Sequence, residues 1–350
     1  MPRSADLFVS LVEGLRLPTT ISIAHCDAYG REQVSRAIRL ALEPLGGIGR
    51  FVCVGQRVLL KPNFVLARRV EEAANTHPVF VFEVARLVRE AGGEPFVGDS
   101  PALGSARHVA SRCGLLGLAR EANLPIVEFR ATRKVPSPRG PVGRALRLAC
   151  EALDADVVIN LPKIKAHGQM FLTLAVKNLF GCVRGRRKAL LHQQIGGRPI
   201  EFGRMLVDVC RVVRPALTLM DGIVALERTG PTGGDPRRLG LIVAGSDCAA
   251  MERVICEIIG ADPERLLTLA AAREAGFGEG NLDQIQVVAD LKVVRPPLSD
   301  LAPSLSARPF VFPERLSALA FTPWRIVRGL ARQAWAFLGP KKKTDDAGQR

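Results

Sequence analysis

Short apolar runs alternate with segments of helical period along most of this chain, and the alternation restricts the folds open to it. Apolar runs that predict strands lie at residues 20–26, 57–63, 94–100, 124–129, 155–163, 216–222 and 239–247. Helical spacing predicts helices at residues 31–45, 77–93, 105–122, 171–179, 201–213 and 249–260. Such alternation requires crossover connections, so we predict an α/β fold with a mainly parallel sheet covered by helices on both faces.

The rest of the chain flanks this alternating part. Residues 1–19 predict an N-terminal helical segment, and residues 20–290 form the predicted α/β domain. The irregular segment 133–143 marks a point, near residues 130–150, where that domain could divide into two subdomains. Residues 291–321 predict a proline-rich linker, and residues 322–350 predict a basic amphipathic helix with a disordered tail.

The charge of the chain favours anionic partners. Lys and Arg number 49 against 34 Asp and Glu, a formal net charge of +15. Phosphorylated metabolites, nucleic acid and anionic membranes all remain candidates on this ground alone. Aromatic residues make up only 5% of the chain, which weighs against a platform for stacking single-stranded bases. We therefore expect no specific nucleic-acid recognition, only weak, salt-sensitive retention.

The cysteines give no sign of a metal cluster. There are eight, and no two of them form a C-x-x-C pair, so the chain contains no iron–sulfur or zinc-ribbon motif and its cysteines are expected in the core. Asp6 and Glu13 interrupt the region where a signal peptide would need an apolar run. The predicted location is the cytoplasm, with association at the inner membrane surface as an alternative.

Polar side chains follow the predicted strands at their carboxyl ends. The strands end in Lys61 and Asn63, Asp99 and Ser100, Asn160 and Lys163, Asp221, and Asp247. Ligands of open α/β sheets bind beyond the carboxyl ends of the strands, so these residues predict one shared cleft. Each also has a purely structural interpretation, because Asp247 precedes a helix that it could cap and Asp221 could form a turn.

The segment 157–188, VVINLPKIKAHGQMFLTLAVKNLFGCVRGRRK, carries the densest set of polar groups. An isolated buried ammonium is costly, so its lysines predict either an anion site or a wet surface. We assign anion binding to Lys61, Asn63, Ser100, Asn160, Lys163, Lys165, Lys177 and Asn178, and proton transfer to Asp99, His167 and Asp221. A divalent metal is a further hypothesis, with His77, Asp99, His167 and Asp221 as its ligands. Lys177 and Asn178 should contribute more to ligand binding than the charge run 184–188, which is interpreted as a solvated loop.

Several segments together resemble the family called domain of unknown function 362. They are LLKPNFV, THP, VGDSPALG, the segment from VINLPKIKAHG to KNLFG, LMDGIVALERTGPTGGDP and LIVAGSDCAAMERVICEIIGADP, in the expected order between residues 20 and 288. The recurring signature of that family falls here on Lys163, Lys165, His167, Lys177, Asn178, Gly230, Pro231 and Gly233. Many relatives also carry a ferredoxin-like iron–sulfur module, whose cysteine run this chain lacks.

Three functional classes follow from these features. The first is an enzyme acting on a small phosphate or carboxylate substrate, with or without a metal. The second is a redox or cofactor-maturation protein that works with a separate iron–sulfur partner. The third is a nucleic-acid binder. The clustering of carboxylates and amides at strand ends favours the first over the third, because binding a phosphate backbone needs a broad basic face.

The segment 322–343 has features of a surface-binding helix. Thr322 and Pro323 suit its first positions. On a helix, one apolar stripe would hold Trp324, Val327, Ala331, Ala334, Trp335 and Leu338, and another face Arg325, Arg328 and Arg332. This pattern fits a helix lying on an anionic membrane surface, and equally one docked on the core of this protein or on a second copy in a homodimer.

Overall fold

The computed structural model describes residues 19–137, 145–195 and 197–319. The predicted N-terminal helical segment and the amphipathic helix at 322–343 lie outside the described residues. The division of the domain near residues 130–150 stays a prediction.

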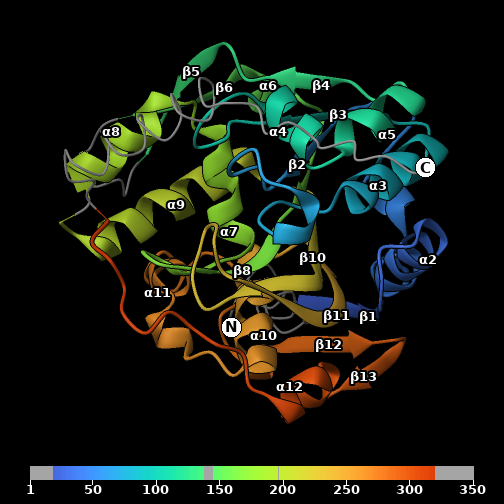
Figure 1. Ribbon diagram of the computed structural model, residues 1–350, viewed down its shortest axis with the longest axis vertical. Coiled ribbons are helices and arrows are strands. Elements are labelled where there is room, and N and C mark those ends of the chain that lie inside the picture. Colours follow the sequence, from blue (N-terminus) through green and yellow to red (C-terminus); the bar gives the residue numbers. More distant parts are fainter. Residues whose placement is uncertain (1–18, 138–144, 196, 320–350) are drawn as a thin grey trace, which may run out of the picture.

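A mostly parallel sheet forms the centre of the molecule (Figure 1). Its strands are β1 (Thr19–His25), β2 (Arg57–Pro62), β3 (Glu94–Asp99), β4 (Ile126–Glu128), β7 (Val157–Leu161), β8 (Lys163–His167), β9 (Phe171–Thr173), β10 (Leu217–Glu227), β11 (Asp235–Gly245), β12 (Ile285–Ala289) and β13 (Lys292–Val294). They lie in the order β13-β12-β1-β11-β10-β7-β2-β3-β4, with β8 beside β10 and β9 beside β8. Strands β10, β7, β2, β3 and β4 are all parallel, which confirms the predicted fold class.

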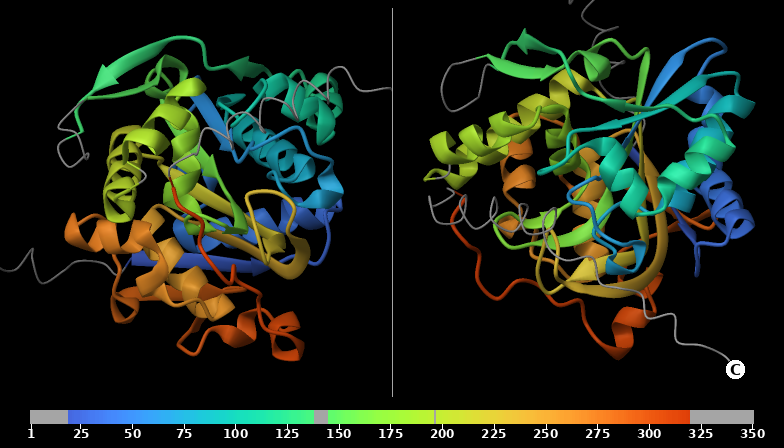
Figure 2. Two further views of the ribbon diagram at one scale, coloured as in Figure 1. Left: turned by 60° about the vertical axis from the view of Figure 1, so that its left-hand side comes forward. Right: turned by 45° about the horizontal axis from the view of Figure 1, so that its top comes forward.

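Helices cover both faces of this sheet (Figure 2). One face packs against α2 (Arg31–Leu42), α3 (Pro78–Glu90), α4 (Ala106–Arg112) and α5 (Leu115–Glu121). The other packs against α7 (Ala175–Asn178), α9 (Pro199–Val213), α10 (Cys248–Ile259) and α11 (Leu267–Glu274). The remaining described α-helices are α6 (Cys150–Leu153), α8 (Arg186–Ile195) and α12 (Ser304–Ala307), and a separate hairpin pairs β5 (Thr132–Val135) with β6 (Leu146–Ala149).

The period of two along a strand divides the sheet residues between these layers. In β2, Val58 and Leu60 pack with α2 and α3, whereas Leu59 packs with the opposite layer. By the same alternation, Lys61 points to the layer of α7 and α9. Its cross-strand neighbour is Asn160 on β7, and the next neighbour is Thr218 on β10. A row of polar residues therefore crosses three central strands on that face.

Three predicted elements differ from the structure. The helix predicted at 105–122 is divided in two at Gly114, whose φ of 88° is a conformation that favours glycine. The helix predicted at 171–179 is wrong: it is strand β9 followed by the single turn α7, because a short apolar run fits a strand as well as a helix. The prediction of a loop at 184–188 is wrong for residues 186–188, which are the first residues of α8.

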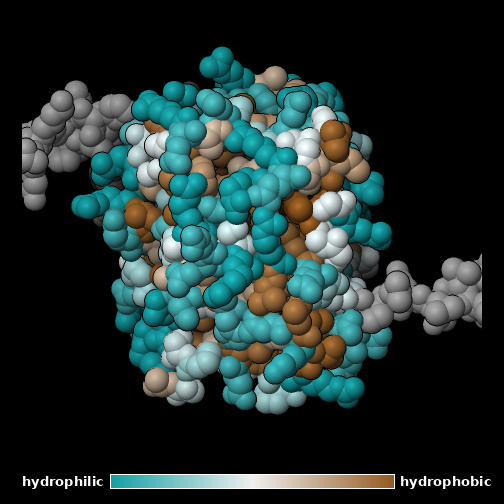
Figure 3. Space-filling view, turned by 90° about the vertical axis from the view of Figure 1, so that its right-hand side faces the viewer, coloured by the Kyte–Doolittle hydropathy of each residue, from teal (hydrophilic) through white to brown (hydrophobic). Residues whose placement is uncertain are grey.

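The side of the molecule that lies to the right in Figure 1 is mostly hydrophilic, with apolar residues in separate patches (Figure 3). Among the described residues, no helix has the length and hydropathy that crossing a bilayer requires.

Candidate functional site

Strand β8 places three basic side chains on one face. Lys163, Lys165 and His167 alternate with Ile164 and Ala166, which are fully buried in the core beneath α9 and α10. Alternate residues of a strand share a face, so the three basic side chains point away from that core. They are nevertheless at most 5% exposed. The sequence interpretation placed them just beyond a strand, but they form a strand of their own.

Lys163 is held in an ion pair with Asp221. Its Nζ lies 2.9 Å from Asp221 Oδ2 and 2.7 Å from the hydroxyl of Tyr29, which in turn donates to Asp221 Oδ1 at 2.7 Å. The backbone N–H of His77 donates to the same carboxylate, and the His77 ring stacks on Tyr29 with centroids 3.5 Å apart. Burial, followed by the Asp221 charge, raises the pKa of Tyr29 well above its usual value. The Asp221 carboxylate thus compensates the charge of Lys163.

Lys61 forms a second buried ion pair, with Asp99. The Nζ–Oδ1 distance is 3.0 Å, and both side chains are at most 2% exposed. Asp99 also accepts the backbone N–H groups of Phe64 and Ser100, at 2.8 and 2.7 Å. Gly181 passes directly over the pair, because a Cβ at that position would lie 2.0 Å from Asp99 Oδ1 and 2.4 Å from Lys61 Nζ. Only glycine fits there without displacing the pair.

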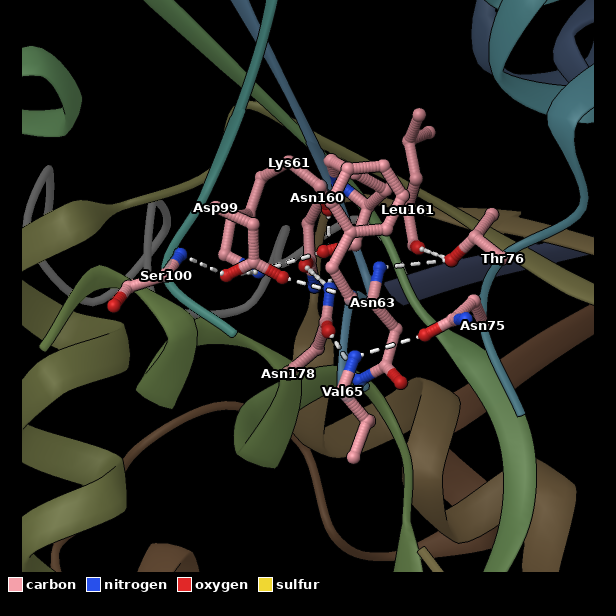
Figure 4. Close-up of polar contacts among 12 residues, drawn as sticks. Lys61, Asn63, Val65, Asn75, Thr76, Asp99, Ser100, Asn160, Leu161 and Asn178 are labelled. Atoms are coloured by element: carbon pink, nitrogen blue, oxygen red, sulfur yellow. Dashed lines mark hydrogen bonds and ion pairs between the residues drawn. The ribbon is translucent and has the colours of Figure 1, made fainter. Parts of the chain in front are cut away.

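Three asparagine side chains connect the strand ends (Figure 4). Asn178 donates to Asn160 Oδ1 at 2.8 Å and to the carbonyl oxygen of Lys61 at 3.1 Å, and it accepts from Asn63 at 2.7 Å. Asn63 Oδ1 in turn accepts a hydrogen bond from Lys165. Because every one of these amides has a partner, the network fixes α7 against the ends of β2 and β7.

Lys165 has only neutral partners. Its Nζ donates to Asn63 Oδ1 and to the carbonyl oxygen of Ala74, the latter at 2.6 Å, and it forms no ion pair with a described carboxylate. Burial lowers the pKa of Lys165 well below its usual value, and repulsion from Lys177 and Lys163 adds to the effect.

Lys177 and Lys188 complete a group of lysines without carboxylate partners. Lys177, on α7, is partly exposed, and its side-chain amine makes no hydrogen bond or ion pair with any residue in the described part of the chain. Burial, with repulsion from Lys188, lowers the pKa of Lys177 to about 7. Lys188, on α8, donates to the carbonyl oxygen of Ser100, and burial lowers its pKa to about 8. We call Lys165, Lys177 and Lys188 the uncompensated lysines.

Two further side chains border the uncompensated lysines. His167 Nδ1 accepts the backbone N–H groups of Gln169 and Met170, both at 3.1 Å, so the proton of the neutral ring is carried by Nε2. Burial, with repulsion from Lys177 and then Lys165, keeps the pKa of His167 well below its usual value. Thr173 lies directly across from Lys165 in the β8–β9 pair, and its buried Oγ1 has no hydrogen-bond partner among the described residues.

A buried glutamate anchors α7 from the opposite side. Glu252, on α10, accepts the backbone N–H of Val176 at 2.8 Å and the hydroxyl of Thr268 at 2.5 Å. Burial raises the pKa of Glu252 to about 7, against these hydrogen bonds. The helix turn that carries Lys177 is therefore fixed by Glu252 at one end and by the asparagine network at the other.

Comparison with known proteins identifies the family. The family model described as domain of unknown function (DUF362) matches residues 58–257. The chain belongs to this family. A relative, the thylakoid-associated protein of Synechocystis sp. (strain ATCC 27184 / PCC 6803 / Kazusa), is 46% identical over 258 residues, which is 74% of this chain and 80% of that protein. The resemblance inferred from the sequence is thereby confirmed.

Two solved structures share part of the fold. The apoprotein of lactate racemase from Thermoanaerobacterium thermosaccharolyticum matches with a TM-score of 0.44 and 13% identity, over 66% of this chain and 55% of that one. A Thermotoga maritima protein matches with a TM-score of 0.40 and 13% identity, over 62% of this chain and 56% of that one. The chain thus spans little more than half the length of these structures, and the likeness is one of fold alone.

The DUF362 match encloses most of the site but not all of it. Lys61 and Glu252 both lie within residues 58–257, whereas Tyr29 comes from the loop between β1 and α2, before the match begins. The signature glycine Gly230 packs on β8, where a Cβ would lie 1.9 Å from the carbonyl oxygen of Ala166. The family segment after β10 therefore supports the strand that carries the lysines.

The structure brings most of the predicted site residues together. The residues linked by contacts or charge around Lys165 are Lys61, Asn63, Asp99, Ser100, Asn160, Lys163, His167, Lys177, Asn178 and Asp221. Their assigned roles stay predictions. Asp247 instead caps α10 through the backbone N–H groups of Ala249 and Ala250, as its structural interpretation predicted.

The metal hypothesis has no ligand set to support it in the described part of the chain. There, no three His, Cys, Asp or Glu side chains are arranged to hold a metal ion. Asp99 and Asp221 are paired with lysines, and His77 Nδ1 accepts the backbone N–H of Val79. The divalent metal, the iron–sulfur partner, the homodimer and the nucleic-acid alternative stay predictions.

Sequence reasoning missed five residues of the site, which are Tyr29, Thr173, Gly181, Lys188 and Glu252. Tyr29 is the single tyrosine of the chain and follows the first predicted strand, a signal that was available. Gly181 ends the segment KNLFG, and nothing local shows that it covers an ion pair. Lys188 was assigned to a solvated loop, yet it contacts Ser100 from a helix.

Proposed function

We propose that this DUF362 protein is an enzyme that binds a small carboxylate- or phosphate-bearing molecule at the uncompensated lysines. The observation that carries the proposal is the unequal charge balance among the lysines. Lys61 and Lys163 each have a carboxylate within 3.0 Å. Lys165, Lys177 and Lys188 have none within ion-pair distance in the described structure, so a bound anion would supply the missing negative charge.

The same groups suit proton transfer to and from the bound anion. A pKa of about 7 leaves Lys177 able to accept or release a proton near neutral pH, which is the property of an effective general acid–base group. The N–H at His167 Nε2 supplies a neutral hydrogen-bond donor beside it.

Binding of inorganic phosphate and of propionate, measured by isothermal titration calorimetry, tests the proposal. Lys177→Met should weaken binding of the anion it contacts by at least about tenfold, since a hydrogen bond to a charged group contributes about 1.5–3 kcal/mol. Lys292→Met is the matched control. Lys292 is exposed on β13, and the same substitution there removes one lysine from the surface.

The protonation of Lys177 gives a second readout. An anion favours the charged form of a nearby lysine, so binding near pH 8 should be accompanied by proton uptake, which appears as a dependence of the binding enthalpy on the buffer. Lys177→Met should reduce that uptake. Equal loss of affinity in Lys177→Met and Lys292→Met would mean that only net charge matters and would contradict the proposal.

A further inference from the structure

We infer that Lys177 is an amine nucleophile and that the anion is a carbonyl compound, a 2-oxo acid or a phosphorylated ketone, with which it forms an imine. This inference rests on the proposed function, because the anion must bind before the amine can attack. It adds the class of substrate and a covalent role for one side chain.

The placement of Lys177 separates it from the other lysines of the site. The amines of Lys61, Lys163 and Lys165 are each engaged by two partners. The amine of Lys177 has no partner among the described residues, although the side chain of its neighbour Asn178 makes three hydrogen bonds. A rigid helix turn therefore carries an amine that no described residue binds. A nucleophile needs such a fixed position and a free lone pair.

The surroundings of Lys177 favour the uncharged amine that attacks a carbonyl. An ammonium has no lone pair, and two conditions promote its loss of a proton: burial and a neighbouring positive charge. Lys177 has both, since Lys188 repels it and the side chain is largely withdrawn from water, which lowers its pKa to about 7. At neutral pH a large fraction of the amine is therefore already nucleophilic.

The groups around Lys177 match the two ends of such a substrate. Lys165 and Lys188 could hold its carboxylate or phosphate group, because a nearby anion favours the charged form of a lysine. Thr173 Oγ1 and His167 Nε2 could donate hydrogen bonds to the carbonyl oxygen. Thr173 Oγ1 is buried without a partner in the described structure, an arrangement that costs free energy unless a ligand oxygen satisfies it.

Imine formation consists of an addition to the carbonyl group followed by the loss of water. The lone pair of Lys177 Nζ attacks the carbonyl carbon, the C–N bond forms, and the carbonyl oxygen takes up a proton while the nitrogen releases one. A second proton on that oxygen expels it as water, and the resulting C=N bond holds a protonated imine. This cation withdraws electrons from the adjacent carbon, so bond cleavage or proton exchange next to the former carbonyl is the class of reaction it promotes.

Reductive trapping tests the inference. The full chain is incubated with sodium borohydride and either pyruvate or dihydroxyacetone phosphate, then analysed by intact-protein and peptide mass spectrometry. We expect one adduct, heavier by the mass of the carbonyl compound less its oxygen atom, on the peptide that contains Lys177. Propionate and glycerol 3-phosphate, which match the two probes in charge but have no reactive carbonyl, should give none.

Two variants distinguish this inference from the proposed function. Lys177→Arg keeps the positive charge, so it should still bind glycerol 3-phosphate or propionate in calorimetry but should lose the adduct, with an unchanged circular dichroism spectrum showing that it folds. Lys292→Met should form the adduct as the wild type does. Anion binding without any adduct, or an adduct spread over other lysines, would overturn the inference and leave the proposed function standing. Absence of anion binding by the wild-type chain would overturn both.

Discussion

Replacing Asp99 with asparagine is expected to destabilise this fold severely, although the two side chains have almost the same size. The substitution removes the one carboxylate paired with Lys61, whose ammonium is fully buried. Breaking a buried ion pair by removing one partner costs about 3–5 kcal/mol, because the remaining charge is left without compensation.

The surroundings of Asp99 place the cost toward the upper part of that range. The carboxylate also accepts the backbone N–H groups of Phe64 and Ser100, one on each oxygen. An asparagine keeps one acceptor and replaces the other with an NH₂ donor, which then faces Lys61 or a backbone N–H. An unsatisfied buried donor costs about 1–3 kcal/mol. Since domains have about 5–15 kcal/mol of stability, the variant should lose a large part of it.

Urea denaturation at pH 7, followed by circular dichroism, measures this effect. The control is Asp154→Asn, which breaks an exposed pair with Arg133 of similar geometry, at 2.7 Å, and should change the midpoint little. Adding Lys61→Met to Asp99→Asn should recover stability, because the uncompensated charge is then gone. The reasoning is refuted if Asp99→Asn and Asp154→Asn shift the midpoint equally, or if the double variant is no more stable than Asp99→Asn.

Two further predictions concern pH and packing. The pKa values of Lys177 and Lys188, lowered from 10.5 to about 7 and about 8, mean that the unfolded chain binds more protons between those values and 10.5. These two groups therefore make the free energy of unfolding rise with pH across that window. Lys177→Met should reduce the rise of the urea midpoint with pH. An unchanged slope would show that Lys177 titrates normally. Gly181→Ala should cost about 1–3 kcal/mol by overpacking the Lys61–Asp99 pair. Gly280→Ala is the control, because no atom lies near a Cβ at that position. Equal urea midpoints for the two variants would mean that the segment at Gly181 shifts to make room for the methyl group.

The strand ends of the site could be predicted from sequence because their order follows from the topology. Lys61, Asp99 and Asn160 each follow or end an apolar run, and parallel strands bring their carboxyl ends to one edge. The order of the strands in the sheet was not needed to predict that these residues lie at one edge. Which carboxylate meets which lysine could not be read in this way, since Asp221 and Lys163 are 58 residues apart and only the sheet register joins them.

The basic strand β8 was missed for a different reason. Its pattern has the period of two that predicts a strand, but its polar members were interpreted as a segment beyond the strand end that forms either an anion site or a wet surface, because lysines are seldom buried. Burial here depends on partners that are distant in the chain. Tyr29 lies 192 residues from Asp221, and Lys188 lies 88 residues from Ser100. A local pattern carries no information about such contacts.

The charge balance of the site divides its lysines by role. A buried ammonium that serves only the fold is most stable with a carboxylate beside it, as Lys61 and Lys163 have. Lys177 has only the cost of burial and of repulsion from Lys188, and the fold nevertheless fixes its helix turn through Glu252 and Asn178. An uncompensated ammonium fixed in place lowers the stability of the free protein, and the proposed ligand would offset this loss by bringing negative charge or by reacting with the amine. The destabilising placement of the Lys177 amine therefore supports the proposal that this side chain reacts with the substrate.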